Sequence, residues 1–160
     1  MKLLTIFFLF FLPVNSFAFD KWVKHYSDLY GVEKNVVDAV IFAESSGRVN
    51  IDGDDGKSFG LMQVQYETSR DLGFRGTEKQ LLYPYYNLKY GIKYIVQCLE
   101  WSKGDVCVAI DMYNRGIKNV RDYPYKGKWE NHRHLKKIVN WFKLRGKLHE
   151  LQNNCAKENW

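Results

Sequence analysis

Apolar residues recur every three or four positions along most of this chain, and this spacing constrains the fold more than any other feature. On an α-helix such residues share one face, whereas a strand buried on one side alternates strictly. Helical stripes begin near Asp20, Val36, Asn87, Val106 and Leu135. No segment alternates in a way that requires a strand. The sequence therefore predicts a mainly α fold, a small orthogonal helix bundle.

Turn residues mark the ends of several predicted elements. The first helix spans residues 20–30, and Gly31 follows it as a helix stop. Residues 50–58, "NIDGDDGKS", carry only turn chemistry, and we expect this polar connection to form the rim of a cleft. A short helix is predicted around residues 67–72, and the last strong helix has a weaker, charged continuation through Leu151.

With 160 residues, the chain is long enough for one compact domain with its own core and too short for two. Its formal net charge of +6 suits an anionic partner, such as nucleic acid, a membrane surface or an acidic cell-wall polymer. No motif that reads nucleic acid accompanies the charge, so nucleic acid is not the expected partner. The one basic cluster is interpreted as the solvated face of a single amphipathic helix and contains Arg133, Lys136, Lys137, Lys143, Arg145 and Lys147.

The first 18 residues, "MKLLTIFFLFFLPVNSFA", have the pattern of a secretory signal peptide. Lys2 gives a basic start, an apolar run of about ten residues follows, and Ser16 and Ala18 have the spacing of a cleavage site. An uncleaved anchor is the alternative, but the run is shorter than the roughly twenty residues of a membrane-spanning helix. We therefore expect cleavage near Ala18, a mature chain that begins at Phe19, and a periplasmic or secreted protein.

Export makes the three cysteines informative, because disulfides persist outside the cytoplasm. Cys98 and Cys107 flank "LEWSKGDV", which is typical of a helix end, a turn and the start of another helix. Two residues equally far from such a turn can face each other, so we predict a Cys98–Cys107 bridge with Cys155 left over. Free thiols, or a pairing that uses Cys155, are the alternatives.

The stretch "VVDAVIFAESSG", residues 36–47, is an apolar helix that ends on a carboxylate. Glu44 continues the apolar stripe four residues after Val40 and three after Ile41. In one interpretation its long side chain bends to water at the helix end, where two serines and a glycine stop the helix. In the other, an apolar wall disfavours the charged form, so the carboxyl stays protonated near neutral pH and serves as a general acid.

Two further stretches carry side chains suited to ligand binding. In "SFGLMQV", residues 58–64, Gly60 permits a close approach of the backbone, and the Gln63 amide offers a donor and an acceptor to hydroxyl or acetamido groups. In "AIDMYNRG", residues 109–116, a helix end carries a tyrosine and an asparagine. Taken alone, the first fits a turn with a buried glutamine, and the second fits ordinary helix-stop chemistry.

The order of these stretches is more informative than any one of them. Four stretches in this order resemble the catalytic domain of soluble lytic transglycosylases: "ESSG" from Glu44, "SFGLMQV" from Ser58, "NLKYGIKYI" from Asn87, and "AIDMYNRG". These enzymes form glycoside hydrolase family 23 and share the lysozyme-like fold with goose-type lysozymes. The resemblance covers about residues 22–142 and implies a lysozyme-like orthogonal helix bundle with a substrate cleft.

The resemblance also implies roles for particular residues. Glu44 would be the single catalytic acid and base, cleaving the β-1,4 bond between N-acetylmuramic acid (MurNAc) and N-acetylglucosamine (GlcNAc) in peptidoglycan. The substrate's own acetamido oxygen would assist, and the product would be a 1,6-anhydroMurNAc end. Neither a cofactor nor a metal ion is expected. The expected substrate-binding residues are Ser58, Gly60, Met62, Gln63, Tyr113, Asn114 and His134.

One position departs from the pattern of the family. Its members usually carry, in the last helix, a Tyr-Val pair whose tyrosine hydroxyl hydrogen-bonds the catalytic glutamate. The matching pair here is His134 and Leu135. A histidine can donate through a ring nitrogen, but a charged ring would weaken the glutamate as an acid.

Two rival functions remain open at this stage. A goose-type lysozyme would hydrolyse the glycan with water activated by a second carboxylate from Asp52, Asp54 or Asp55, residues that otherwise only form the turn. A non-catalytic glycan-binding or assembly protein would keep the cleft, although the presence of Glu44 argues against it.

The expected organisation is a signal peptide at 1–18, a catalytic domain at 19–145 and a C-terminal tail at 146–160. Glycan strands of peptidoglycan are the expected partner. Resemblance to small exported transglycosylases adds a secretion, conjugation or pilus assembly machine as a further expected partner. We expect the chain to act as a monomer.

Overall fold

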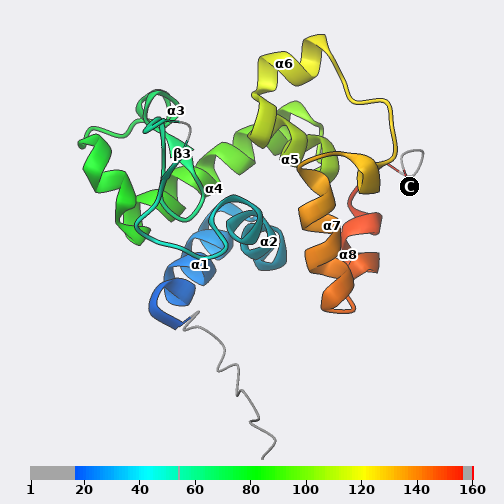
Figure 1. The fold of residues 1–160 in the computed structure, drawn as a ribbon, viewed down its shortest axis with the longest axis horizontal. Helices are drawn as coiled ribbons and strands as arrows, with labels where there is room; N and C mark the ends of the chain where they lie inside the picture. Colours follow the sequence, from blue (N-terminus) through cyan, green and yellow to red (C-terminus); the bar gives the residue numbers. More distant parts are fainter. Residues whose placement is uncertain (1–16, 54, 157–159) are drawn as a thin grey trace, which may run out of the picture.

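Helices dominate the computed structural model, which describes residues 17–53, 55–156 and 160 (Figure 1). Most of the predicted signal peptide, residues 1–16, lies outside the described residues, and so does Asp54. The prediction of a mainly α fold is confirmed. In chain order, the elements are α1 (Phe17–Tyr30), α2 (Lys34–Ser45), β1 (Asp52–Gly53), β2 (Ser58–Phe59), β3 (Val64–Gln65), α3 (Tyr66–Asp71), the 3₁₀ turn Glu78–Leu82, α4 (Pro84–Trp101), α5 (Val106–Arg115), α6 (Ile117–Asp122), the 3₁₀ turn Trp129–Asn131, α7 (Leu135–Leu144) and α8 (Leu148–Asn153).

A small antiparallel sheet, which the sequence did not predict, follows α2. Strand β2 pairs with β1 on one side and β3 on the other, with Phe59 opposite Asp52 and Val64. Each strand has only two residues, which is too short to display an alternating pattern. The polar connection at residues 50–58 thus contains β1 and leads into β2.

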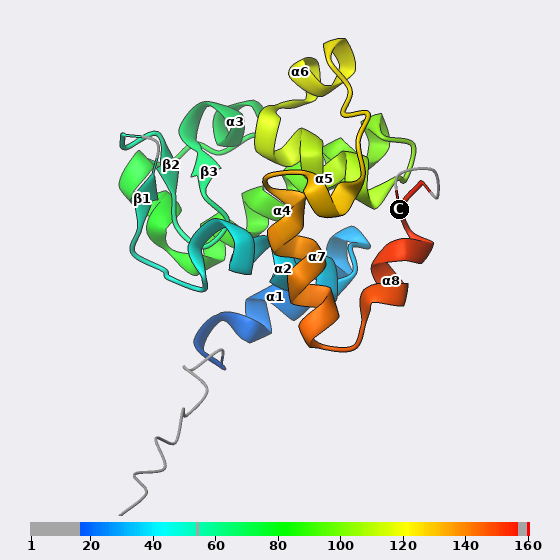
Figure 2. The same cartoon turned by 45° about the vertical axis from the view of Figure 1, so that its right-hand side comes forward.

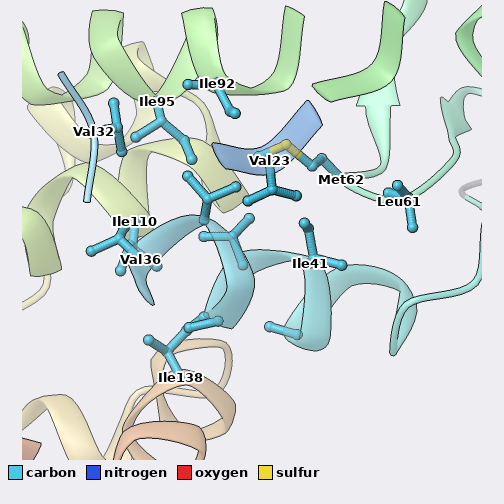
Figure 3. Packing of buried hydrophobic residues seen from close by; sticks show 14 of the residues in the cluster. Val23, Val32, Val36, Ile41, Leu61, Met62, Ile92, Ile95, Ile110 and Ile138 are labelled. Carbon is cyan, nitrogen blue, oxygen red and sulfur yellow. The ribbon is translucent and has the colours of Figure 1, made fainter. Parts of the chain in front are cut away.

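Helix α2 lies in the middle of the bundle and contacts both α1 and α7 (Figures 1 and 2). Its Val37 and Val40 are fully buried. Figure 3 shows Ile92 and Ile95 of α4 on one side of α2 and Ile138 of α7 on the other. A helix covered on two sides needs apolar residues over much of its circumference, which explains the apolar run that precedes Glu44.

The last predicted helix is in fact two helices. Helix α7 ends at Leu144, and Gly146 adopts a left-handed backbone with φ of 66° before α8 begins. Glycine adopts this conformation without a steric penalty, so the chain can turn here. The prediction of one continuous helix through Leu151, with all six basic residues of the cluster on one face, is therefore wrong.

The predicted disulfide is also wrong. Cys107 is bonded to Cys155, with 5.3 Å between their Cα atoms, and Cys98 is a buried free thiol. Cys98 lies in a separate small apolar cluster with Ala109 and Met112, so its side chain packs away from the bridge. Equal distance from the turn between α4 and α5 did not bring Cys98 and Cys107 together, because helix rotation also decides which residues face each other.

The bridge belongs to a larger attachment of the C-terminal tail to the start of α5. The Val106 N–H donates to the Asn154 carbonyl oxygen at 2.8 Å, and the Ala156 N–H donates to Asp105 Oδ2 at 2.8 Å. The other carboxylate oxygen of Asp105 accepts from the Val108 N–H and caps α5. The described part of the tail is therefore folded onto the bundle.

None of the helices in the described part of the chain is both long and apolar enough to cross a lipid bilayer.

Candidate active site

A cleft of about 770 Å³ opens where the end of α2, the β2–β3 segment, the end of α5 and the start of α7 meet. These elements are far apart in the sequence, and the helix packing brings them to one place. Six of the eight predicted site residues line the cleft: Glu44, Ser58, Gln63, Tyr113, Asn114 and His134.

Glu44 occupies the last turn of α2, and its side chain is only 15% exposed. The helix stops immediately afterwards, because Ser46 adopts a left-handed backbone and its N–H donates to the Phe42 carbonyl oxygen. Its neighbours Ala43 and Ser45 are buried. The carboxyl therefore lies at a helix end, as one interpretation of the sequence required, but its side chain is mostly buried at the cleft and does not extend into bulk water.

His134 lies beside this carboxyl, with its Nε2 atom 3.4 Å from Glu44 Oε1. Burial, together with the positive charge of the nearby Lys137, lowers the pKa of His134 to about 4. The ring is therefore neutral near pH 7, so it does not place the positive charge beside Glu44 that the sequence raised as a concern.

Tyr113, near the end of α5, also lines the cleft. Its hydroxyl donates a 2.7 Å hydrogen bond to the Met62 carbonyl oxygen, which fixes the end of α5 against the segment between β2 and β3. Burial raises the pKa of Tyr113 well above its usual value, and the nearby charge of Glu44 raises it further. The phenol is therefore neutral and keeps its proton for this hydrogen bond.

Gly60 and Met62 do not line the cleft but support residues that do. The Met62 side chain is fully buried and packs against Gly91 of α4. The Asn87 amide accepts from the Met62 N–H at 2.8 Å and donates to the Phe59 carbonyl oxygen at 2.6 Å. Gly60 has φ of 70°, and a Cβ there would approach the Asn87 amide to 2.5 Å. This packing fixes the backbone between Ser58 and Gln63.

A family model for the transglycosylase SLT domain matches residues 21–136. The chain belongs to this family. Its fold is also similar to that of lytic transglycosylase Slt from Pseudomonas aeruginosa, in the X-ray structure of an inactive mutant, with a TM-score of 0.57 and 22% sequence identity. That similarity covers 82% of this chain but only 22% of the Slt chain, which is much longer. The predicted lysozyme-like fold of a lytic transglycosylase catalytic domain is confirmed.

The SLT domain match ends just after His134, so α8 and Cys155 lie beyond it. The residues predicted to form the site all fall inside the match. The disulfide therefore links a helix of the family domain to a C-terminal segment outside it.

The SLT domain cleft also holds basic residues that were not predicted to belong to the site. Arg115, Arg133 and Lys137 line it, and Lys137 Nζ donates to the Ala43 carbonyl oxygen at 3.1 Å. The sequence suggested a solvated helix face for Arg133 and Lys137, and both are indeed exposed. Lys137 follows His134 by three residues, and this spacing was the one signal in the sequence that both side chains lie on the same side of α7, facing the cleft.

Glu44 is the only carboxylate among the described residues that line the cleft. Asp52 and Asp55, two of the three acids considered for a lysozyme mechanism, are exposed and do not line it. The third acid, Asp54, lies outside the described residues.

One group of potential metal ligands is found in the described part of the chain, and it lies outside the cleft. It consists of Asp105, Cys107 and Cys155. The two sulfur atoms are bonded to each other, and both Asp105 oxygens accept backbone hydrogen bonds. Thiolates, not disulfide sulfurs, are the usual metal ligands, so this group does not fit a metal ion in its oxidised form.

Proposed function

We propose that this SLT domain is a peptidoglycan lytic transglycosylase that cleaves the β-1,4 bond between MurNAc and GlcNAc and leaves a 1,6-anhydroMurNAc end. The main support for the proposal is the environment of Glu44. Its mostly buried carboxyl lies beside the neutral ring of His134, and no other described residue that lines the cleft has a carboxylate. Family membership supports the reaction class.

In the first step, the protonated Glu44 carboxyl donates its proton to the glycosidic oxygen. The bond between this oxygen and the anomeric carbon of MurNAc breaks, and GlcNAc leaves with the proton. The MurNAc acetamido oxygen stabilises the positive charge that develops at the anomeric carbon, so no enzyme nucleophile is needed.

In the second step, the Glu44 carboxylate removes the proton of the MurNAc 6-hydroxyl, and that oxygen bonds to the anomeric carbon. Glu44 is protonated again, and no water is consumed. The 6-hydroxyl outcompetes water because it is held within reach of the anomeric carbon. A neutral His134 beside Glu44 can donate to the carboxylate without stabilising it as strongly as a cation would.

Ser58, Gln63, Tyr113 and Asn114 are the proposed sugar contacts. They line the cleft together with Glu44 and offer hydroxyl and amide groups. Such side chains form hydrogen bonds with the hydroxyl and acetamido groups of sugars. Neither a metal ion nor a cofactor takes part in the proposed steps.

The location and partners are proposed from the sequence. Residues 1–18 would direct export, and the protein would act on peptidoglycan outside the cytoplasm as a monomer. A positively charged domain is attracted to an anionic wall polymer. A secretion, conjugation or pilus assembly machine remains a proposed partner, supported by the resemblance of the sequence alone.

Mass spectrometry of muropeptides released by the purified protein tests the reaction. We expect anhydro ends, which are one water lighter than hydrolysis products and have no reducing terminus. Glu44→Gln should abolish release, because the amide keeps the shape but cannot give the proton, and acid–base catalysis is worth about 10²- to 10⁴-fold. Asp52→Asn and Asp55→Asn serve as controls and should leave the yield unchanged. Mostly reducing ends, lost in an aspartate variant, would establish a lysozyme-type hydrolase.

A further inference from the structure

A buried carboxylate lies outside the cleft lining and is not used in the mechanism. Asp111 of α5 is fully buried. Arg115 donates to it through two nitrogens, with Nε 2.6 Å from Oδ1, and His132 Nε2 lies 2.9 Å from the same oxygen. Burial alone would raise the pKa of Asp111, but the hydrogen bonds from Arg115 and His132 outweigh it and hold the pKa below its usual value. Asp111 is therefore an anion that fixes two partners.

His132, one of these partners, joins α5 to the start of α7. The ring is buried, and while Nε2 donates to Asp111, Nδ1 accepts from the Leu135 N–H at 3.2 Å. These two contacts require a neutral ring with its proton on Nε2. His132 thus caps the first turn of α7 and is itself oriented by Asp111.

The N-cap residue of α7 and its first turn contact the end of α2. His134 lies between His132 and Leu135 in the sequence, and its Nε2 is 3.4 Å from the Glu44 carboxyl. One turn further along, Lys137 donates to the Ala43 carbonyl oxygen of α2. The start of α7 is therefore attached to α5 through His132 and to α2 through Lys137, with His134 held between the two attachments.

We infer that Asp111 and His132 are positioning residues that keep His134 beside the catalytic carboxyl by fixing the first turn of α7. This inference rests on the proposed role of Glu44. Neither residue lines the cleft. His132 acts on the reaction through His134, and Asp111 acts through His132, although it also holds Arg115, which does line the cleft. Losing either contact should therefore lower kcat, while sugar binding, and with it KM, should change little.

Two substitutions at one position separate the two contacts of His132. In His132→Asn, the amide oxygen can take the place of Nδ1 and cap α7, but the bond to Asp111 is lost. In His132→Gln, the amide nitrogen can take the place of Nε2 and reach Asp111, but the cap is lost. Together with Asp111→Asn, these variants are assayed for kcat and KM on soluble uncrosslinked glycan strands, below the unfolding temperature of each protein. We expect each kcat to fall about three- to tenfold, with KM within about twofold.

A double-mutant cycle with His134 distinguishes positioning from general destabilisation. His134→Leu removes the ring nitrogens and should lower kcat about tenfold by itself. In that background, His132→Asn should cause no further loss beyond about twofold, because the group that His132 positions is gone. Asp111→Asn takes its place in the cycle if His132→Asn does not fold. Val23→Ala, a buried change in α1, is the control: it should lower the unfolding temperature and leave kcat unchanged.

The possible outcomes separate this inference from the proposed function. Two results would overturn the inference: an unchanged kcat in the single variants, or a loss in the double variant equal to the product of the two single losses. In either case, an inactive Glu44→Gln variant would leave the proposed function standing. Full activity in Glu44→Gln would overturn both.

Discussion

His134 should make the stability of the folded protein sensitive to acid. Its pKa in the folded structure is about 4, chiefly because of burial, whereas a histidine in an unfolded chain titrates near about 6.5. Between these values the unfolded chain binds more protons than the folded one, so the free energy of unfolding falls as the pH falls. The effect fades as the pH rises through about 6.5 and is absent above about pH 7.5, where the ring is neutral in both states.

The size of the effect follows from the two pKa values. Lowering the pH from 7 to 4.5 should reduce the free energy of unfolding by about 2.5 kcal/mol through this residue alone. The side chain is only 8% exposed, so solvent screening does not call for a large discount. Other groups titrate over the same range, and a variant that lacks only His134 separates their contribution.

Urea unfolding followed by circular dichroism at pH 7 and pH 4.5 measures this contribution. The free energy of unfolding of the wild-type protein should fall by about 2.5 kcal/mol more than that of His134→Gln, which cannot take up a proton in this range. His149→Gln removes an exposed histidine and should behave like the wild type. Equal losses in the wild type and His134→Gln would refute the buried, neutral state of His134.

The other predictions concern the residue at position 134, the disulfide and the net charge. His134→Tyr should retain more of the wild-type kcat than His134→Leu, because a phenol also donates to a carboxylate, and a folded tyrosine variant no more active than the leucine variant would contradict this role. Reductant should lower the free energy of unfolding of the wild type and of Cys98→Ala by up to about 4 kcal/mol, because the bridge closes a loop with a sequence separation of 48, but should leave Cys155→Ser unchanged. An equal response of all three in a urea titration would argue against the Cys107–Cys155 bridge. Clearing of a peptidoglycan suspension should slow as sodium chloride rises from about 0.05 to 0.5 M, because salt screens the attraction of a basic protein to the wall. A rate that is independent of salt would show that the charge has no such part.

The helices and the place of Glu44 were predictable because both depend on local spacing. The apolar stripe of α2 ends on Glu44, and the structure shows why the stripe is broad: the helix is covered by neighbours on two sides. The three strands were not predictable, since two residues are too few to show a period. The break after Leu144 could have been read from Gly146, a residue that commonly ends helices.

Long-range contacts account for what the sequence did not reveal. Asp111 and His132 have no shared motif, and only the packing of α5 against the segment that leads into α7 brings their side chains together. The bridge from Cys107 to Cys155 depends on a tail that no local pattern directs to α5. His134 drew attention only through the resemblance to a family, and its neutral state depends on a burial that spacing alone does not give.

The contacts of Asp111 also constrain how this sequence can evolve. The fully buried carboxylate of Asp111 is tolerated because Arg115 and His132 both donate hydrogen bonds to it. Replacing one of these residues alone leaves a buried charge or a buried hydrogen-bond donor without a partner. A lineage can leave this arrangement only by changing the three positions in concert, or by exchanging all of them for apolar residues of similar volume. Among descendants of this chain, the residues at positions 111, 115 and 132 should therefore change together. Where two of them are unchanged, the third should be unchanged as well.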